Sequence, residues 1–145
     1  MNPSPRRRHM RITQATAYAL AALLQLSDDA TLPPVPCSEL SRLGSMPERF
    51  LLQIMRHLVT AGLAKSTRGV DGGYRLSKPL SQISLLDVAE AIDGPLATGL
   101  NDILSIALAP GSKKLMENTL AAALGDTKLR LEALKLDALK VAKQK

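Results

Sequence analysis

The sequence predicts a mainly α-helical fold with one small β-hairpin and further helices in its C-terminal third. In several segments apolar residues recur at the spacing of one helix face, most regularly at Phe50, Leu51, Ile54, Met55 and Leu58. Two short β-prone runs, residues 63–67 and 74–77, flank a glycine-rich stretch and predict the hairpin. The chain has 145 residues, enough for one domain with a hydrophobic core and an additional helical arm.

A first helix is predicted over residues 13–26, because Thr13 suits an N-terminal cap and an apolar periodicity follows it. The residues expected to face the core are Ile12, Ala17, Leu20, Ala21 and Leu24. A loop is then expected over residues 28–36, because three of these residues are proline, which cannot continue a helix.

A second, shorter helix is predicted over residues 37–43, with Leu40 and Leu43 directed toward the core. Gly44 then breaks the chain. The third helix is expected to begin at a capping box, in which the side chains of Ser45 and Glu48 bond to the free backbone amides of the first turn.

The third helix is expected to end at Gly62, where a left-handed terminating residue fits. A short helix, a glycine turn and a longer helix form the layout of a helix-turn-helix. The hairpin that follows makes the predicted unit a winged helix-turn-helix, with the hairpin as its β-wing.

The face of the third helix opposite its apolar stripe carries Arg49, Leu52, Gln53 and Arg56. These residue types suit a DNA major groove, where Arg pairs with guanine, Gln pairs with adenine and an apolar tip contacts the thymine methyl group. We therefore predict that Arg49, Gln53 and Leu52 read base edges. Arg56 is predicted to contact phosphate. An ordinary solvated helix face has the same composition, so the helix alone leaves both interpretations open.

The predicted hairpin favours the interpretation that this surface binds DNA. Its tip, residues 68–73, is rich in glycine, so its backbone can approach a ligand closely, and Arg68 is a candidate for insertion into a narrow minor groove. Lys65, Arg75 and Lys78 are expected to contact phosphate. A hairpin without any ligand is the alternative for the glycines alone.

A fourth helix is predicted to start at a second capping box, formed by Ser84 and Asp87, and to stop at Gly94. The apolar residues expected to pack on the wing and on the first helix are Leu85, Val88, Ala89 and Ile92. The carboxylates of Asp87, Glu90 and Asp93 are expected to face solvent or a basic partner.

The C-terminal third carries two longer helical patterns, residues 113–124 and 129–141, with a break or kink expected at Gly125 and Asp126. The apolar residues of these helices are Leu115, Met116, Leu120, Ala123, Leu124, Leu131, Leu134 and Leu136. A lone helical arm has no core of its own, so this stripe is expected to pack against a second copy of the chain. Packing within the same chain is the alternative.

The net charge of +6 is distributed unevenly along the chain. Residues 35–78 contain seven Lys or Arg and three acidic residues, whereas residues 79–110 contain four acidic residues and no Lys or Arg. Residues 111–145 contain eight basic and four acidic residues. This segregation suits a one-sided surface for double-stranded DNA. Stacking on single-stranded bases is disfavoured, because the chain has only two Tyr, one Phe and no Trp.

Other classes of function find little support in the sequence. No nucleophile–base pair or cluster of metal ligands can be assembled, so we do not expect an enzyme. Cys37 is the single cysteine and cannot form an internal disulfide. It is a candidate redox thiol if its helix N-terminus lowers its pKa, but a small buried residue is the commoner case. No apolar run is long enough to span a membrane, and we expect a cytoplasmic protein.

Four motifs follow one another along the chain: Met10-Arg11-Ile12-Thr13, Tyr18-Ala19-Leu20, residues 68–76 and residues 83–94. Together they resemble the Rrf2 family of IscR- and NsrR-like bacterial winged-helix transcriptional regulators. The resemblance covers roughly residues 10–95 and implies a homodimer that binds a partly palindromic operator. It places Arg49 and Gln53 at base-reading positions, and Arg68 and Gly69 at wing-tip positions that enter the minor groove. Asp71 departs from the family pattern, and its carboxylate is expected to weaken the wing contact slightly.

The resemblance fails where the family carries its sensor. Well-known relatives bind an iron–sulfur cluster through three cysteines after the fourth helix, whereas residues 95–112 contain no Cys and no His. Ala17 and Leu52 stand where other relatives have acidic residues. Cluster ligation depends on thiolates, so we predict neither a cluster nor another cofactor. A short apolar helix expected over residues 101–109 either completes the core or lines an effector pocket.

Three regions are therefore expected: a disordered basic extension at 1–9, a winged helix-turn-helix domain at 10–95, and a linker, dimerisation and effector region at 96–145. The arginines at 6–8 either reach DNA or belong to a solubilising tail. The expected function is a homodimeric DNA-binding repressor. The alternative is a sensorless family member that acts mainly through a protein partner or a small-molecule effector, with DNA binding secondary.

Overall fold

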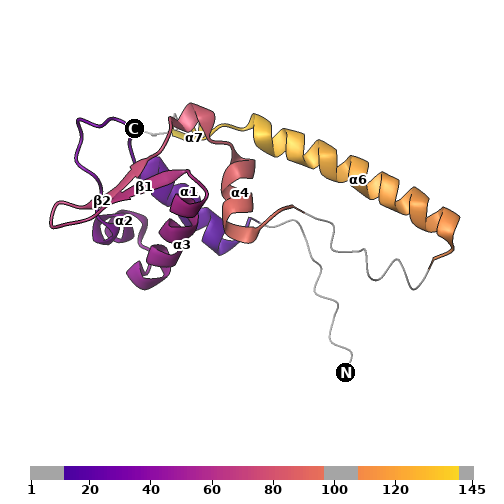
Figure 1. Cartoon of the computed structure of the whole chain (residues 1–145), viewed down its shortest axis with the longest axis horizontal. Coiled ribbons are helices and arrows are strands. Elements are labelled where there is room, and N and C mark those ends of the chain that lie inside the picture. Colours follow the sequence, from indigo (N-terminus) through magenta and orange to yellow (C-terminus); the bar gives the residue numbers. More distant parts are fainter. Residues whose placement is uncertain (1–11, 97–107, 141–145) are drawn as a thin grey trace, which may run out of the picture.

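A computed structural model describes residues 12–96 and 108–140, and it has the predicted mainly helical fold with one two-stranded sheet (Figure 1). The elements are α1 (Gln14–Gln25), α2 (Cys37–Gly44), α3 (Glu48–Thr60), β1 (Ala64–Thr67), β2 (Gly73–Leu76), the 3-10 turn η1 (Leu80–Gln82), α4 (Leu85–Asp93), α6 (Pro110–Ala133) and α7 (Asp137–Lys140). The predicted extension at 1–9 lies outside the described residues, as does most of the helix predicted at 101–109.

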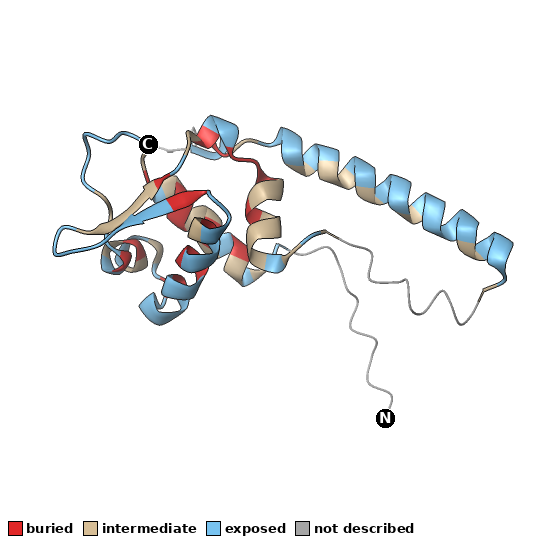
Figure 2. Cartoon of the chain, in the orientation of Figure 1, coloured by how far each residue is buried: buried red, intermediate tan, exposed pale blue. Residues whose placement is uncertain are grey.

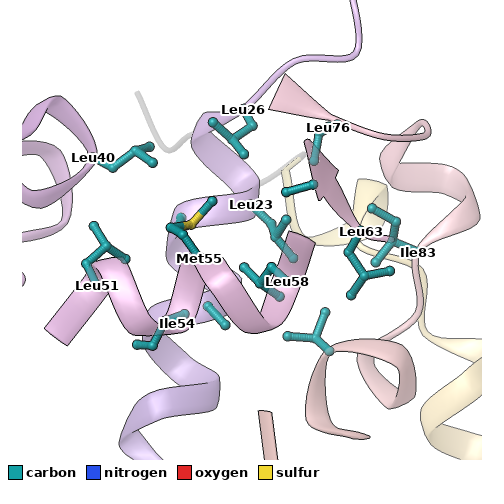
Figure 3. Close-up of a cluster of buried hydrophobic side chains, with 14 of the residues drawn as sticks. Leu23, Leu26, Leu40, Leu51, Ile54, Met55, Leu58, Leu63, Leu76 and Ile83 are labelled. Carbon is teal, nitrogen blue, oxygen red and sulfur yellow. The ribbon is translucent and has the colours of Figure 1, made fainter. Parts of the chain in front are cut away.

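One hydrophobic core lies between α1, α2, α3, α4 and the inner side of the sheet (Figure 3). Four of the five residues predicted for the apolar stripe of α3 are buried in it, namely Leu51, Ile54, Met55 and Leu58. Full burial of one such side chain contributes about 1.5–3 kcal/mol. The prediction that the fifth residue, Phe50, lies in the core is wrong, because Phe50 is 40% exposed. Its ring instead meets the ring of Tyr18 edge to face, with centroids 5.8 Å apart.

Helix α1 begins as predicted, but of its predicted core residues Leu20, Ala21 and Leu24 are only partly buried against the core, and other residues are buried more deeply. The Thr13 hydroxyl accepts a hydrogen bond from the Thr16 amide at 3.1 Å and caps the helix. Thr16, Ala19, Ala22 and Leu23 are buried, whereas Ala17 is exposed and Ile12 is 56% exposed. Ala or Leu occupies every position from 19 to 24, so periodicity alone fits more than one face. The packing of α3 and α4 against α1 selects the face that is buried.

The turn between α2 and α3 differs from the predicted capping box. Ser45 adopts a left-handed conformation, with φ 51°, and ends α2, while Pro47 precedes α3 without a side-chain cap. The Ser41 hydroxyl donates to the Met46 carbonyl, and the Met46 amide donates to the Ser41 carbonyl at 3.0 Å. These two bonds make Ser45 a terminating residue instead of an N-cap. Met46 is buried after this turn, whereas Leu43, predicted to point inward, is 46% exposed.

Two later boundaries are confirmed. Gly62 follows α3 with φ 75°, and Gly94 ends α4 with φ 82°. The Ser84 hydroxyl accepts from the Asp87 amide at 3.0 Å, while the Ser84 amide donates to the Asp87 carboxylate at 2.9 Å. This reciprocal pair is the predicted capping box of α4. Leu85 and Val88, which are buried, orient the helix on the core.

Helix α4 packs against α1, α3 and α6, and its acidic residues have specific partners. The Asp93 carboxylate accepts hydrogen bonds from the Thr13 hydroxyl at 2.9 Å and from the Thr16 hydroxyl at 2.7 Å. Asp93 is exposed, as predicted, and its carboxylate also bonds α4 to the start of α1. A Glu90 carboxylate oxygen lies 3.7 Å from Lys128 Nζ, which links α4 to α6.

Helix α6 is one continuous helix, so the predicted break at Gly125 is wrong. A glycine in a helix interior costs only about 1 kcal/mol relative to alanine, which the neighbouring turns can tolerate. No residue of α6 is buried in the described part of the chain (Figure 2). The helix extends away from the domain, on the side opposite to the tip of the hairpin (Figure 1).

After α6 the chain returns to the domain. Leu136 is fully buried in the core, although the sequence placed it in the stripe for a second copy. The Leu136 amide donates to the Ile83 carbonyl at 2.9 Å, and the Leu85 amide donates to the Leu134 carbonyl at 2.9 Å. The predicted helix 129–141 is thus interrupted by a short extended segment that pairs with the start of α4.

Candidate nucleic-acid interface

The exposed face of α3 is set by its buried face. Because Leu51, Met55 and Leu58 fix the rotation of the helix in the core, the side chains between them point outward. All four residues predicted for this face are exposed: Arg49, Leu52, Gln53 and Arg56. The helix therefore presents two cations, an amide and an apolar tip on one side, which is a combination that can read base edges and hold phosphate.

The wing is a two-stranded antiparallel hairpin in which Lys65 pairs with Arg75 and Ser66 pairs with Tyr74. Its tip is fully open: Arg68 and Asp71 are exposed, and Val70 has no protein neighbour covering it. Gly69 has φ 110°, and its carbonyl accepts from the Gly72 amide at 3.0 Å, which closes the tight turn. The tip thus places one arginine beside a narrow stretch of glycine backbone.

The predicted phosphate contacts of the wing have different surroundings. Lys65 is exposed and Lys78 is half-buried. Arg75 is also half-buried, and its Nη1 donates a hydrogen bond to the backbone carbonyl of Asp29 at 3.0 Å. The structure therefore brings Arg75 to the loop between α1 and α2, whereas Lys65 on the neighbouring strand is exposed.

The loop between α1 and α2 is hydrogen-bonded to β2, a pairing that sequence reasoning missed. The Val35 amide donates to the Tyr74 carbonyl at 3.0 Å, and the Tyr74 amide donates to the Val35 carbonyl at 2.9 Å. A loop without periodicity gives no signal for such a pairing. As a consequence, the wing is bonded to Val35, two residues before the first residue of α2.

A hollow of about 410 Å³ lies between the wing and the start of α2. It is lined by Pro36, Cys37 and the wing residues 66–69 and 72–74. Cys37 is buried at its base, and burial, followed by the nearby Glu48 carboxylate, raises the pKa of its thiol. Burial likewise raises the pKa of the Tyr74 phenol. A raised thiol pKa lowers the fraction of reactive thiolate, which disfavours a redox role for Cys37.

The chain does not offer the donor set of a cluster. An iron–sulfur cluster is held by several thiolates, but the whole sequence has one cysteine, and it is buried in α2. Among the residues that the structure describes, no group of three or more His, Cys, Asp or Glu side chains is placed to hold a metal ion. The described helices also include none that is long and apolar enough to cross a membrane.

Known proteins are similar to this chain in both sequence and fold. A family model, Rrf2, described as an iron-dependent transcriptional regulator, matches residues 12–141. A predicted HTH-type transcriptional regulator of Mycobacterium tuberculosis is 39% identical over 98 residues, which cover 65% of this chain and 61% of the relative. IscR of Escherichia coli is 34% identical over 84 residues, which cover 58% of this chain and 52% of IscR. The chain thus spans roughly half to three fifths of the curated relatives that it matches.

Solved structures extend the likeness in fold to most of the chain. CymR, the global cysteine regulator of B. subtilis, has a TM-score of 0.70 at 23% identity, covering 94% of this chain and 100% of CymR. IscR of T. potens has a TM-score of 0.65 at 24% identity, covering 92% of this chain and 89% of that structure. At such identities these structures support the fold alone. Because the family model matches nearly the whole chain, the protein belongs to the Rrf2 family of transcriptional regulators.

Proposed function

We propose that the protein is a DNA-binding transcriptional regulator that inserts α3 into a major groove and the wing tip into the adjacent minor groove. One observation carries the proposal: in a chain of this family, a helix face with two arginines and a glutamine lies beside a glycine-tipped wing with an exposed arginine. A regulator of this kind needs no catalytic residue, and we propose none.

The exposed residues divide by the chemistry that they can supply. Arg49, Leu52 and Gln53 are proposed to read base edges, because Arg and Gln can form two hydrogen bonds with guanine and adenine. Arg56 and Lys65 are proposed to contact phosphate, with Lys78 at the margin. Arg68 and Gly69 are proposed to enter the minor groove, where the negative potential of a narrow groove attracts a guanidinium group.

The active form is proposed to be a homodimer held by α6. A helix of 24 residues is about 36 Å long, and none of its described side chains is buried in its own chain. Leu115 and Leu129 are 70% and 66% exposed, which leaves apolar surface for a second copy. Residues 10–95 would then form the DNA-binding unit and residues 96–145 the dimerisation region. Two α3 helices held about one DNA turn apart would bind a partly palindromic operator and act as a repressor by excluding polymerase.

The iron dependence in the family's description is not part of this proposal. The single cysteine is buried next to the wing, so the donor set of a thiolate-held cluster is missing from the sequence. We propose that the protein regulates without a cluster. Material purified under anaerobic conditions is expected to be colourless, and visible absorbance that scales with bound iron would contradict this.

The DNA-binding proposal is tested by titrating the protein on genomic fragments at two salt concentrations. Tight, sequence-selective binding with a steep salt dependence is expected. Arg49→Ala and Gln53→Ala are each expected to relax discrimination at one base position by about 1–3 kcal/mol. Gln25→Ala on α1 is the control, because Gln25 is exposed outside both the proposed DNA interface and the proposed dimerisation helix. Unchanged footprints in both interface variants would refute the assignment of α3.

A second candidate function is favoured by a cavity of about 340 Å³ between α1, α4 and α6. Its walls are mostly apolar, including Leu85, Ala89 and Leu131, with the carboxylates of Glu90 and Asp93 at one side. A cavity of this size and lining suits a small apolar effector. If this second candidate function is correct, DNA binding is secondary, and the DNA titration gives weak, unselective binding.

The neutral fluorophore N-phenyl-1-naphthylamine tests the cavity directly. Its fluorescence is expected to rise with wild-type protein and to rise less with Ala89→Phe, which fills the cavity. The control is Ala30→Phe, because Ala30 is exposed in the loop between α1 and α2, away from the cavity. Equal signals from both variants would remove this candidate.

A further inference from the structure

One nitrogen of the Arg75 guanidinium, Nη1, donates a hydrogen bond to the backbone of the protein itself. Arg75 and Lys65 are register partners in the hairpin, so the two cations lie opposite each other on adjacent strands. Lys65 is exposed, whereas Arg75 is half-buried and donates to the Asp29 carbonyl at 3.0 Å. Two residues of equal charge at paired positions therefore have different partners: solvent for one, and the backbone of the α1–α2 loop for the other.

The contact of Arg75 belongs to a longer seam between β2 and the α1–α2 loop. The seam also contains the two backbone hydrogen bonds between Val35 and Tyr74, and the Leu76 amide donates to the Ser27 carbonyl at 3.0 Å. Gly73 allows the close approach, because a Cβ there would lie 2.5 Å from the Val35 carbonyl carbon and oxygen. The loop is thus bonded to β2 near its two ends, at Ser27 and Asp29 and again at Val35.

The loop that Arg75 contacts also has hydrogen bonds of its own. The Asp29 carboxylate accepts from the Thr31 hydroxyl at 2.6 Å and from the Thr31 amide at 2.8 Å, and the Asp29 amide donates to the Ser27 hydroxyl oxygen at 3.1 Å. The loop then leads through Val35 into α2. Because α2 packs on α3, the seam connects the position of the wing to the position of α3.

We propose that Arg75 is a positioning residue of the wing and makes no phosphate contact of its own. It ties β2 to the α1–α2 loop and so holds the wing tip, with Arg68, at a fixed place relative to α3. The inference rests on the proposed DNA binding, because the position of the tip matters only if Arg68 contacts DNA. It separates Arg75 from Lys65, which has the same charge but no such contact with the loop.

A double-mutant cycle on DNA binding tests the proposal. A residue that acts through Arg68 loses its effect when Arg68 is absent, whereas independent contacts add. Arg75→Ala is expected to weaken binding about fivefold in the wild-type background, and less than about twofold in the Arg68→Ala background. The matched cycle of Arg56→Ala with Arg68→Ala is expected to be additive, because Arg56 lies on α3 outside the seam. Full additivity for Arg75 and Arg68 would overturn the proposal.

The salt dependence gives a second readout, which a general loss of stability does not imitate. Arg75→Gln removes the charge but keeps a side-chain donor. If Arg75 held a phosphate, its loss in the Arg68→Ala background would lower the slope of log K against log salt by about 0.9. We expect no change of slope in that background. A drop of that size would show a direct contact and overturn the proposal.

Hydrogen exchange of the free protein tests the seam without DNA. In Arg75→Ala the amides of Val35, Tyr74 and Leu76 are expected to exchange faster, while in Lys65→Ala they keep the wild-type rate. Unchanged rates in Arg75→Ala would overturn the positioning role. Arg75→Lys replaces Arg75→Ala if the latter does not fold, with the same expected direction. If wild-type protein shows the seam but binds no DNA, the proposed function fails while the contact itself stands.

Discussion

Leu136→Ala probes whether the C-terminal segment belongs to the core of its own chain. Leu136 is 0% exposed and packs in the cluster formed by α1, α3 and α4, and its amide donates to the Ile83 carbonyl. Deleting three buried carbons from such a site typically costs about 2–5 kcal/mol, which combines lost transfer free energy with a cavity. For a chain of this length, about 3 °C of melting temperature is lost per kcal/mol, so a fall of roughly 6–15 °C is expected.

Leu129→Ala is the matched control, because it removes the same atoms seven residues earlier in the chain. Leu129 lies on α6 and is 66% exposed, so its loss leaves no internal cavity. Within one chain, the change is expected to stay within about 0.5 kcal/mol. If α6 packs on a second copy, the effect of Leu129→Ala instead depends on protein concentration, because association stabilises by mass action.

Urea unfolding at two protein concentrations separates the two possibilities. Leu136→Ala is expected to lower the free energy of unfolding by the same amount at both concentrations. A change below about 1 kcal/mol, or one that appears only at the lower concentration, would refute the burial of Leu136 in its own domain and return it to the stripe for a second copy.

Three further outcomes are expected. Ser84→Ala removes the acceptor of the α4 capping box and should lower the free energy of unfolding in urea by about 1 kcal/mol; an unchanged midpoint would mean that the box is not formed in solution. Gly125→Ala should raise helicity and stability by about 0.5–1 kcal/mol, because Gly125 lies inside α6, whereas Gly62→Ala should destabilise through its φ of 75°; circular dichroism melts of both variants compare them, and destabilisation by Gly125→Ala would restore the break. Cys37 should react with iodoacetamide far more slowly in the folded than in the urea-unfolded protein, because burial raises the pKa of its thiol, and equal rates would contradict its burial. The stability gained from the neutral thiol is complete below the ordinary thiol pKa and is lost as the pH rises through the raised pKa.

Most boundaries were predictable because short-range chemistry encodes them. The Ser84–Asp87 box and the left-handed glycines at 62 and 94 depend on residues within a few positions of one another. The exposed face of α3 was predictable because its apolar and polar residues alternate cleanly at helical spacing. In the α2–α3 turn the same local rules allowed two solutions, and the Ser41 bonds to Met46 selected the one in which Ser45 ends α2.

The sequence by itself determined the helices and strands up to the end of α4, which residues α3 leaves exposed, and that one cysteine cannot hold a thiolate cluster. The tertiary structure alone decided which face of α1 is buried, that Arg75 bonds to the loop before α2, and that Leu136 returns to the core. The physical reason is the separation along the chain between the residues that interact. Periodicity and turn chemistry depend on neighbours along the chain, whereas these three outcomes depend on residues tens of positions away, and only the packed fold brings them together.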